Sequence, residues 1–324
     1  MSDPTAGRGP GARALRVGTR ASALATAQSQ HVADRITEVT GVATELVEVT
    51  TKGDVDRRPL VDFGGVGVFV GALRDALLSD RVDVAVHSLK DIPTAPSDGL
   101  VLAAVPARTD PRDVLIARDG LTLGELPVGS RVGTGSPRRA AQLRALGLGL
   151  EIVPIRGNID TRMRLVSSGE VDAVVLARAG LSRTGRLDAI TETLDPLQML
   201  PAPGQGALAV ECRRAEGGAD AELAVLLQQA LDDPAARTAV SAERSLLATL
   251  EAGCTAPVGA LAEVALGDQG EEVWLRAVVG AVDGSQLIRM STTGAVADAI
   301  GLGRALAEEM IAEGAGALVG ERVP

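Results

Sequence analysis

Three stretches of the sequence combine arginine with glycine, serine or threonine where a predicted strand gives way to a predicted helix. They are residues 16–22 (RVGTRAS), 133–139 (GTGSPRR) and 156–162 (RGNIDTR). Backbone amides at a helix N-terminus attract anions, and a guanidinium group is a two-pronged donor suited to carboxylates and phosphates. A capped helix with a surface arginine would explain one such stretch, but not its recurrence. Together they predict a binding site for an anionic ligand.

The pair Arg138 and Arg139 strengthens this prediction. Both fall in the first turn of the helix predicted over residues 137–146. Positive charges there oppose the helix dipole and cost up to about 1 kcal/mol unless an anion lies beside them. The stretch lacks the third glycine of a dinucleotide fingerprint and the Gly-Lys-Ser/Thr ending of a P-loop, so no nucleotide site is expected.

A different chemistry is indicated by residues 87–91 (HSLKD), which follow the strand-like run VDVAVH. Open α/β sheets bind ligands at the carboxyl ends of their strands. A carboxylate there can stabilise a developing cation or move a proton, so Asp91 is the acid–base candidate. The plain alternative is a surface ion pair between Lys90 and Asp91. His87 is expected to be structural.

The glycine-rich run at residues 64–71 (GGVGVFVG) has the wrong spacing for a dinucleotide fingerprint. It predicts a mobile loop that leads into a helix. We expect Phe69, within this run, to pack over a ligand.

The two cysteines lie in different settings. Cys254 falls in a turn of small residues (AGCTAP) and is expected to be accessible, whereas Cys212 lies in an apolar strand (ALAVEC) and is expected to fill the core. Because the two cysteines and two histidines are scattered, no metal site is expected.

Composition limits the partners of the chain. Its 324 residues are enough for two or three domains, and its net charge of −10 repels nucleic acid and anionic lipid, so neither is expected as a partner. With one Trp, two Phe and no Tyr, the chain offers almost no platform for stacking bases. A bound anion must therefore be held by a local basic cluster. No signal segment or membrane-spanning run is evident, so a cytoplasmic protein is expected.

Alternating strand and helix patterns predict two α/β lobes and a smaller α+β domain. Residues 1–13 form a disordered lead, residues 14–106 with about 206–228 the first lobe, residues 107–205 the second lobe, and residues 229–324 the C-terminal domain with Cys254. Predicted helices cover residues 22–40, 66–79, 137–146, 160–168, 234–250 and 295–313. Predicted strands cover residues 15–18, 45–50, 82–87, 101–105, 114–117, 131–133, 151–154, 173–177, 207–212, 274–282 and 287–291.

Taken in order, the motifs RVGTRASALATAQ, HSLKDIPT, GTGSPRRAAQL, RGNIDTR, LPAPGQGALAVECR and GCTAPVGA closely resemble those of the porphobilinogen deaminase (hydroxymethylbilane synthase) family. The likeness runs from about residue 15 to about residue 258. It implies a transferase of tetrapyrrole, porphyrin and heme biosynthesis that condenses four porphobilinogen molecules head to tail, with loss of ammonia, into hydroxymethylbilane. It also implies two lobes like those of periplasmic binding proteins, with the cofactor held in the cleft between them, and a third domain that carries the cofactor's cysteine. We expect a monomer.

Roles for individual residues follow from the same resemblance. The family's covalent cofactor, dipyrromethane, is attached by a cysteine thioether that falls on Cys254, and its catalytic aspartate falls on Asp91. Each pyrrole carries two carboxylates, which the arginine clusters would hold. The implied cofactor-binding residues are Lys90, Ser136, Arg138, Arg139, Arg162 and Arg183. The implied substrate-binding residues are Arg20, Ser22, Arg156, Gln205 and Phe69.

The sequence departs from the family pattern in one region. Many members have Gly-Gly-Lys-Gly followed by Lys-Glu-Leu-Glu, where this chain has GGVG at residues 64–67 and GALR at residues 71–74. Lysine contacts from that loop are therefore not expected. The alternative class is a two-lobed solute-binding or ligand-sensing protein without catalysis. That reading gives no role to Cys254 or to Asp91 beside Lys90.

Overall fold

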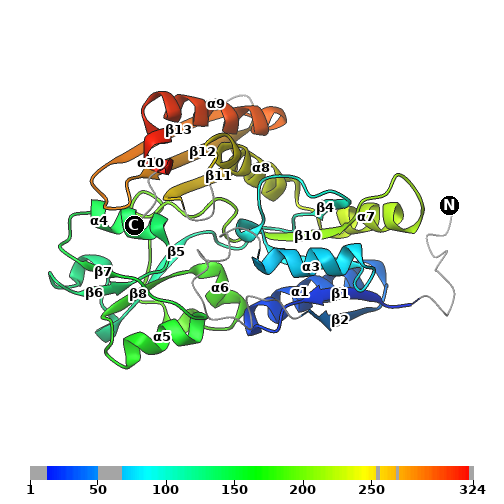
Figure 1. Ribbon diagram of the computed structural model, residues 1–324, viewed down its shortest axis with the longest axis horizontal. Coiled ribbons are helices and arrows are strands. Elements are labelled where there is room, and N and C mark those ends of the chain that lie inside the picture. The colour runs from blue at the N-terminus through cyan, green and yellow to red at the C-terminus, as the bar shows by residue number, and fades with distance from the viewer. Residues whose placement is uncertain (1–12, 50–67, 253–255, 268–269, 321–324) are drawn as a thin grey trace.

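The computed structural model of the chain describes residues 13–49, 68–252, 256–267 and 270–320. Its first sheet has the strand order β2-β1-β3-β10-β4 (Figure 1). Strand β1 pairs in parallel with β2 and β3, whereas β10 is antiparallel to β3 and β4. The strands are β1 (Leu15–Thr19), β2 (Thr44–Glu48), β3 (Val84–Ser88), β4 (Leu100–Ala104) and β10 (Leu208–Arg213). The carboxyl ends of the parallel strands β1 and β3 therefore lie at one edge of the sheet.

Helices α1 (Ala23–Thr40), α3 (Val68–Leu78) and α7 (Gly218–Leu231) belong to the first sheet. Helix α1 begins where Ser22 caps it, with the Ser22 Oγ accepting a hydrogen bond from the Ala25 amide at 3.3 Å. It ends at Gly41, whose φ of 69° is the left-handed conformation typical of a helix C-terminus. Val32 and Ile36 on one face of the helix are buried against the sheet.

The second sheet has the order β7-β6-β8-β5-β9. Its strands are β5 (Asp113–Ala117), β6 (Arg131–Gly133), β7 (Glu151–Val153), β8 (Ala173–Ala177) and β9 (Glu192–Thr193). Helices α4 (Pro137–Ala145), α5 (Ile159–Ser167) and α6 (Arg178–Arg183) follow β6, β7 and β8 respectively. Each helix thus starts at the carboxyl end of a strand, which is the position where open α/β sheets bind ligands.

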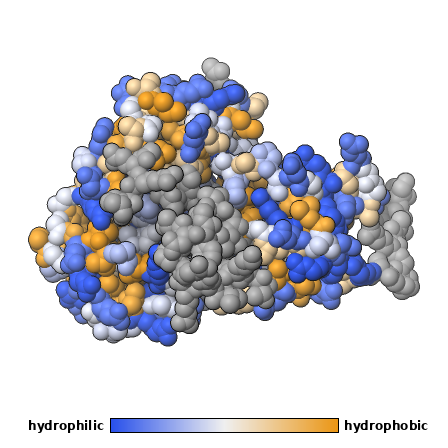
Figure 2. All heavy atoms as spheres, in the orientation of Figure 1, coloured by the Kyte–Doolittle hydropathy of each residue, from blue (hydrophilic) through white to orange (hydrophobic). Residues whose placement is uncertain are grey.

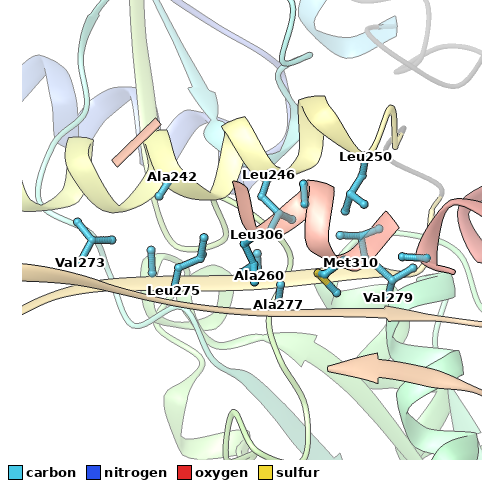
Figure 3. Close-up of a cluster of buried hydrophobic side chains, with 14 of the residues drawn as sticks. Ala242, Leu246, Leu250, Ala260, Val273, Leu275, Ala277, Val279, Leu306 and Met310 are labelled. Carbon is cyan, nitrogen blue, oxygen red and sulfur yellow. The ribbon is translucent and has the colours of Figure 1, made fainter. Parts of the chain in front are cut away.

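The C-terminal unit is an antiparallel sheet of β11 (Val258–Gly267), β12 (Gly270–Gly280) and β13 (Leu287–Ala295). Helices α8 (Pro234–Thr249), α9 (Ala299–Ala312) and α10 (Ala315–Gly320) pack against it. Figure 3 shows Leu246 of α8 and Leu306 and Met310 of α9 meeting Leu275 and Ala277 of the sheet. Alternate residues of β12 face this core, as the period of a half-buried strand requires.

Two connections join the first sheet to the second. Residues 105–112 lead from β4 to β5, and residues 194–207 return from β9 to β10. The second connection also touches the C-terminal sheet, because the Ala260 amide donates to the Pro201 carbonyl at 2.9 Å. Gly206, in the same connection, has a φ of 89°, and a Cβ there would collide with the Thr109 carbonyl. The glycine therefore allows the two connections to pass each other closely.

The predicted fold class is confirmed: two α/β sheets are followed by a smaller α+β unit. Helices α6, α7 and α10 and strands β9 and β11 are absent from the sequence expectation. Helix α7 starts without a side-chain cap and with two glycines, so its beginning carries no start signal. The limits given above for the three domains remain a prediction.

None of the helices among the described residues is long and apolar enough to cross a membrane. On the described part of the face in Figure 2, hydrophilic and hydrophobic residues are interspersed.

Candidate active site

A cluster of charged side chains lies between the first two sheets. Arg138 and Arg139 come from the first turn of α4, Asp113 from the first position of β5, Gln205 from the returning connection and Lys90 from the turn after β3. These residues are far apart in the sequence and are brought together by the two connections. Lys90 of the HSLKD stretch is thus linked through Gln205 to Asp113, which pairs with both arginines of the GTGSPRR stretch.

Asp113 is the centre of the cluster and has no solvent exposure. Its Oδ2 accepts a hydrogen bond from Arg138 Nη2 at 2.8 Å, and its Oδ1 accepts one from Arg139 Nη2 at 2.7 Å. Gln205 Nε2 also donates to Oδ1 at 2.7 Å. Burial raises the pKa of Asp113, but the two guanidinium groups and the Gln205 amide outweigh it and hold that pKa well below its usual range.

The anion that sequence reasoning expected beside the paired arginines is thus supplied in part by the protein. Asp113 belongs to none of the three arginine-containing motifs and opens the apolar run DVLIA. An aspartate at the first position of an apolar strand could have identified this residue, because the strand is buried along its length and a buried carboxylate needs a cationic partner.

The remaining bonds of the two guanidinium groups go to backbone carbonyls. Arg138 Nη1 donates to the Leu200 carbonyl at 2.5 Å, and Arg139 Nη1 donates to the Val175 carbonyl at 2.9 Å. Ser136 caps α4 through a 3.5 Å contact from the Arg139 amide to its Oγ. The backbone and the side chains at this helix N-terminus are therefore both fixed.

Lys90 adds a further positive charge. Its Nζ donates to Gln205 Oε1 at 3.3 Å, so the same amide group contacts Lys90 and Asp113. Burial lowers the pKa of Lys90 to about 8, with Arg139 and Arg138 acting in the same direction against the carboxylates of Asp91 and Asp113. The low pKa reports mainly the removal of the ammonium group from water, because the Asp91 carboxylate raises this pKa more than either arginine lowers it.

The cluster holds more cations than carboxylates. Lys90, Arg138 and Arg139 surround Asp113. Arg162 lies close to Arg139: burial lowers the pKa of Arg162, and the charge of Arg139 lowers it further. The Nε atoms of Arg138, Arg139 and Arg162 are buried and have no hydrogen-bond partner among the described residues. Buried donors without partners are costly, so this arrangement fits a bound group that carries carboxylates.

Asp91 lies at the edge of this cluster and is exposed. It ends the short turn η2 (Leu89–Asp91), which is anchored by the fully buried Leu89 and by a hydrogen bond from the Leu89 amide to the Ala207 carbonyl at 3.0 Å. Ser88, just before the turn, contacts Gln28 of α1 at 3.1 Å. The carboxylate is therefore solvent-accessible on a fixed backbone, next to a half-buried lysine.

His87 is structural, as expected. Its side chain is buried, and Nε2 lies 3.3 Å from Glu211 Oε2. Arg74 of α3 holds the same carboxylate with two bonds of 3.0 and 2.7 Å. Burial raises the pKa of Glu211, but His87 and Arg74 outweigh it and lower that pKa to about 2. Arg74 belongs to the segment that departs from the family pattern.

Arg183 is the last residue of α6 and forms hydrogen bonds with both connections between the first two sheets. Its Nη2 donates to the Gly206 carbonyl at 2.6 Å and to Thr109 Oγ1 at 3.3 Å. Burial lowers the pKa of Arg183 to about 10. Among the other predicted residues, Arg20 is half-buried just before α1, and Arg156 is exposed between β7 and α5.

Two predicted features cannot be placed. Cys254 and the glycine-rich residues 64–67 lie outside the described residues. Phe69 is the second residue of α3, and its side chain lies outside the described part of the structure. Cys212, in contrast, is fully buried in the core of the first sheet, and burial raises the pKa of its thiol to about 11. The expectation that Cys212 fills the core is confirmed.

Comparison with known proteins gives matches over most of the chain. A family model described as "Porphobilinogen deaminase, dipyromethane cofactor binding domain" matches residues 15–221, and one for the porphobilinogen deaminase C-terminal domain matches residues 237–312. Porphobilinogen deaminase 1 of Streptomyces coelicolor is 59% identical over 319 residues, covering 96% of this chain and 98% of its own. Porphobilinogen deaminase of Nocardia farcinica is 58% identical over 312 residues, covering 95% and 88%.

Among solved structures, the chain is similar to the VFT2 domain of BvgS from Bordetella pertussis. The TM-score is 0.43 at 18% identity, and the match covers 72% of this chain and 92% of that one.

Proposed function

The chain belongs to the porphobilinogen deaminase family, and from that premise we propose which of its residues carry the reaction. The enzyme is a hydroxymethylbilane synthase, a transferase of tetrapyrrole biosynthesis that joins four porphobilinogen molecules head to tail with release of ammonia. Its matched region includes a dipyrromethane cofactor binding domain. The alternative of a solute-binding protein without catalysis has no support from these relatives.

The cofactor site is the cationic cluster around Asp113. The observation that carries this assignment is the set of buried Nε donors on Arg138, Arg139 and Arg162 that lack a partner among the described residues. The carboxylates of a pyrrole chain would satisfy such donors and balance the excess positive charge. We assign cofactor binding to Lys90, Ser136, Arg138, Arg139, Arg162 and Arg183.

Dipyrromethane, when bound, supplies the pyrrole carbon to which the first substrate is joined. The protein contributes orientation and charge. Arg138 and Arg139 are fixed on both sides by Asp113 and by backbone carbonyls, so their remaining donors are preorganised for carboxylates. The protonated Lys90, held by Gln205, adds a positive charge at the boundary between the cofactor site and Asp91.

Asp91 is the catalytic carboxylate in this proposal. Loss of ammonia from porphobilinogen leaves positive charge on the pyrrole, which a nearby carboxylate stabilises. The exposed Asp91 can reach a substrate in the open part of the site and accept or return a proton there. Arg20, Ser22, Arg156 and Gln205 would hold the substrate carboxylates and hydrogen-bonding groups, with Phe69 beside them.

Cys254 is the proposed thioether anchor of the cofactor. It falls in the connection between α8 and β11, and the other cysteine, Cys212, is unsuited because its thiol is buried with a raised pKa. Cys254 falls in a stretch of small residues (AGCTAP) and is the thiol that we expect to act as the nucleophile.

The test is the intact mass of the denatured protein purified from cells. The wild type should exceed its polypeptide mass by two linked pyrrole units, Cys254→Ser should lack the excess, and the matched Cys212→Ser variant should keep it. If Cys212→Ser loses the excess mass and Cys254→Ser keeps it, the cofactor is attached to Cys212 and the proposed anchor is wrong. A bare wild-type mass that stays bare after incubation with porphobilinogen would contradict the cofactor proposal.

We further propose that the enzyme is a cytoplasmic monomer. Light scattering of the holoenzyme and fractionation of the source cells test these two points.

A further inference from the structure

Glu243 of α8 is a buried carboxylate outside the site described above, and its side chain has no solvent exposure. It accepts hydrogen bonds from three separate parts of the chain. Arg108 donates through Nη1 at 2.6 Å and Nη2 at 3.1 Å, the Gly204 amide donates at 2.6 Å, and the Ala262 amide donates at 2.8 Å. The connection from β4 to β5 (residues 105–112), the connection from β9 to β10 (residues 194–207) and the C-terminal sheet therefore all donate hydrogen bonds to one carboxylate.

Arg108 extends this junction toward the reaction site. Its Nε donates to the Gln205 carbonyl at 2.9 Å, while the side chain of Gln205 contacts Lys90 and Asp113. Glu243 is thus linked to Arg108, and Arg108 to the backbone of Gln205, whose side chain contacts the cationic cluster.

We propose that Glu243 and Arg108 are positioning residues that fix the C-terminal unit relative to Lys90 and Asp113 during chain growth. This inference rests on the proposed function, because Cys254 falls between α8 and β11, the two elements that Glu243 joins. A cofactor tethered there must keep its register with side chains that belong to the other two sheets.

The energetics fit a positioning role better than a stabilising one. A buried ion pair repays its desolvation only with good geometry and further hydrogen bonds, and replacing such a pair with apolar residues is often neutral or stabilising. Here every bond that Glu243 accepts comes from a segment that must be held in register, two of them through backbone amides of different units. Fixed geometry between the units is what the pair supplies.

The variants are Glu243→Gln, which removes the charge, and Arg108→Lys, which keeps the charge but loses the two-pronged contact and the bond to the Gln205 carbonyl. The matched control is Asp232→Asn. Asp232, which follows the last residue of α7, pairs with Arg237 of α8 at 2.7 Å and accepts from the Val105 amide, but none of its bonds among the described residues reaches Gln205. All three variants should lose thermal stability.

Intact masses during turnover separate a positioning role from a structural one. We expect both test variants to carry the two-pyrrole cofactor, to turn over at least tenfold more slowly at saturating porphobilinogen, and to accumulate partly elongated chains. Asp232→Asn should show the wild-type distribution of chain lengths.

The inference is overturned if Arg108→Lys and Glu243→Gln match the control in turnover and in chain lengths. It is also overturned if they lose turnover only in proportion to their loss of folded protein. Failure of the proposed function is distinct, since the wild type would then make no product and carry no added mass.

Discussion

At the scale of single residues, the site combines one carboxylate that is buried with one that is exposed. Asp113 has no access to solvent and stays ionised between two arginines, so it organises charge and cannot exchange protons with a substrate. Asp91 is exposed on a fixed turn. The two environments assign different tasks to the same functional group, as is common where acid–base chemistry is performed.

The exposed position of Asp91 leads to a prediction for Asp91→Ala. We expect turnover to fall by at least a hundredfold, a loss within the range of a missing acid–base group. Stability should change by no more than about 0.5 kcal/mol, because the side chain is exposed. Steady-state rates of hydroxymethylbilane formation and urea unfolding measure the two effects.

Asp98→Ala, at an exposed aspartate seven residues along the same loop, is the matched control and should keep wild-type turnover. Retention of more than a tenth of the wild-type rate by Asp91→Ala would exclude a catalytic role.

At the scale of elements, the strand-to-helix junctions were predictable because each carries a local signal. Ser22 and Ser136 cap helices, Pro137 opens one, and the apolar run of β8 is unbroken. The partners across the molecule were not predictable. Asp113 meets Arg139 because β5 and β6 lie in one sheet on either side of β8, and it meets Gln205 because the returning connection passes beside β5. No local pattern encodes either contact.

The first turn of α4 gives the element-level prediction. Arg139→Leu removes the bonds to Asp113 and to the Val175 carbonyl and leaves Asp113 with Arg138 and Gln205. We expect unfolding free energy to fall by about 1–3 kcal/mol and the fraction of protein that carries the two-pyrrole cofactor to drop sharply. Urea unfolding and intact mass measure the two quantities.

Arg144→Leu is the control at the other end of the same helix, where the exposed Arg144 binds the Val282 carbonyl. It should keep the full cofactor mass. An Arg139→Leu protein with complete cofactor and normal product yield would show that this guanidinium does not hold carboxylates of the ligand.

At the scale of the whole molecule, a net charge of −10 coexists with a cationic interior cluster. The global field repels an anionic pyrrole chain, so the proposed cofactor site must act at short range, where buried charges are screened little by salt. The same charge makes the folded state repel itself near neutral pH. Mild acidification relieves this repulsion until carboxylates that are paired in the folded state begin to take up protons.

Glu211 and Asp83 are two of the paired carboxylates that limit stability in acid. Burial raises the pKa of each, but Arg74 and His87 for Glu211, and Arg16 for Asp83, lower both values to about 2. A lowered folded pKa means that the unfolded chain binds protons more readily. The contribution is complete above the unfolded pKa of about 4 and is lost as pH falls through the folded value.

We therefore expect unfolding free energy to vary little between pH 7 and pH 5 and to fall steeply below pH 4, by on the order of 2 kcal/mol for Glu211 alone. Glu211→Gln should be less stable than the wild type at pH 7 and should lose less stability on going from pH 5 to pH 3. Glu38→Gln, at an exposed glutamate paired with Arg35, should follow the wild-type curve. Urea unfolding at a series of pH values measures all three proteins. A Glu211→Gln curve as steep as the wild type would mean that the acid limit is set elsewhere, because removing a proton-linked carboxylate must flatten the dependence that it causes.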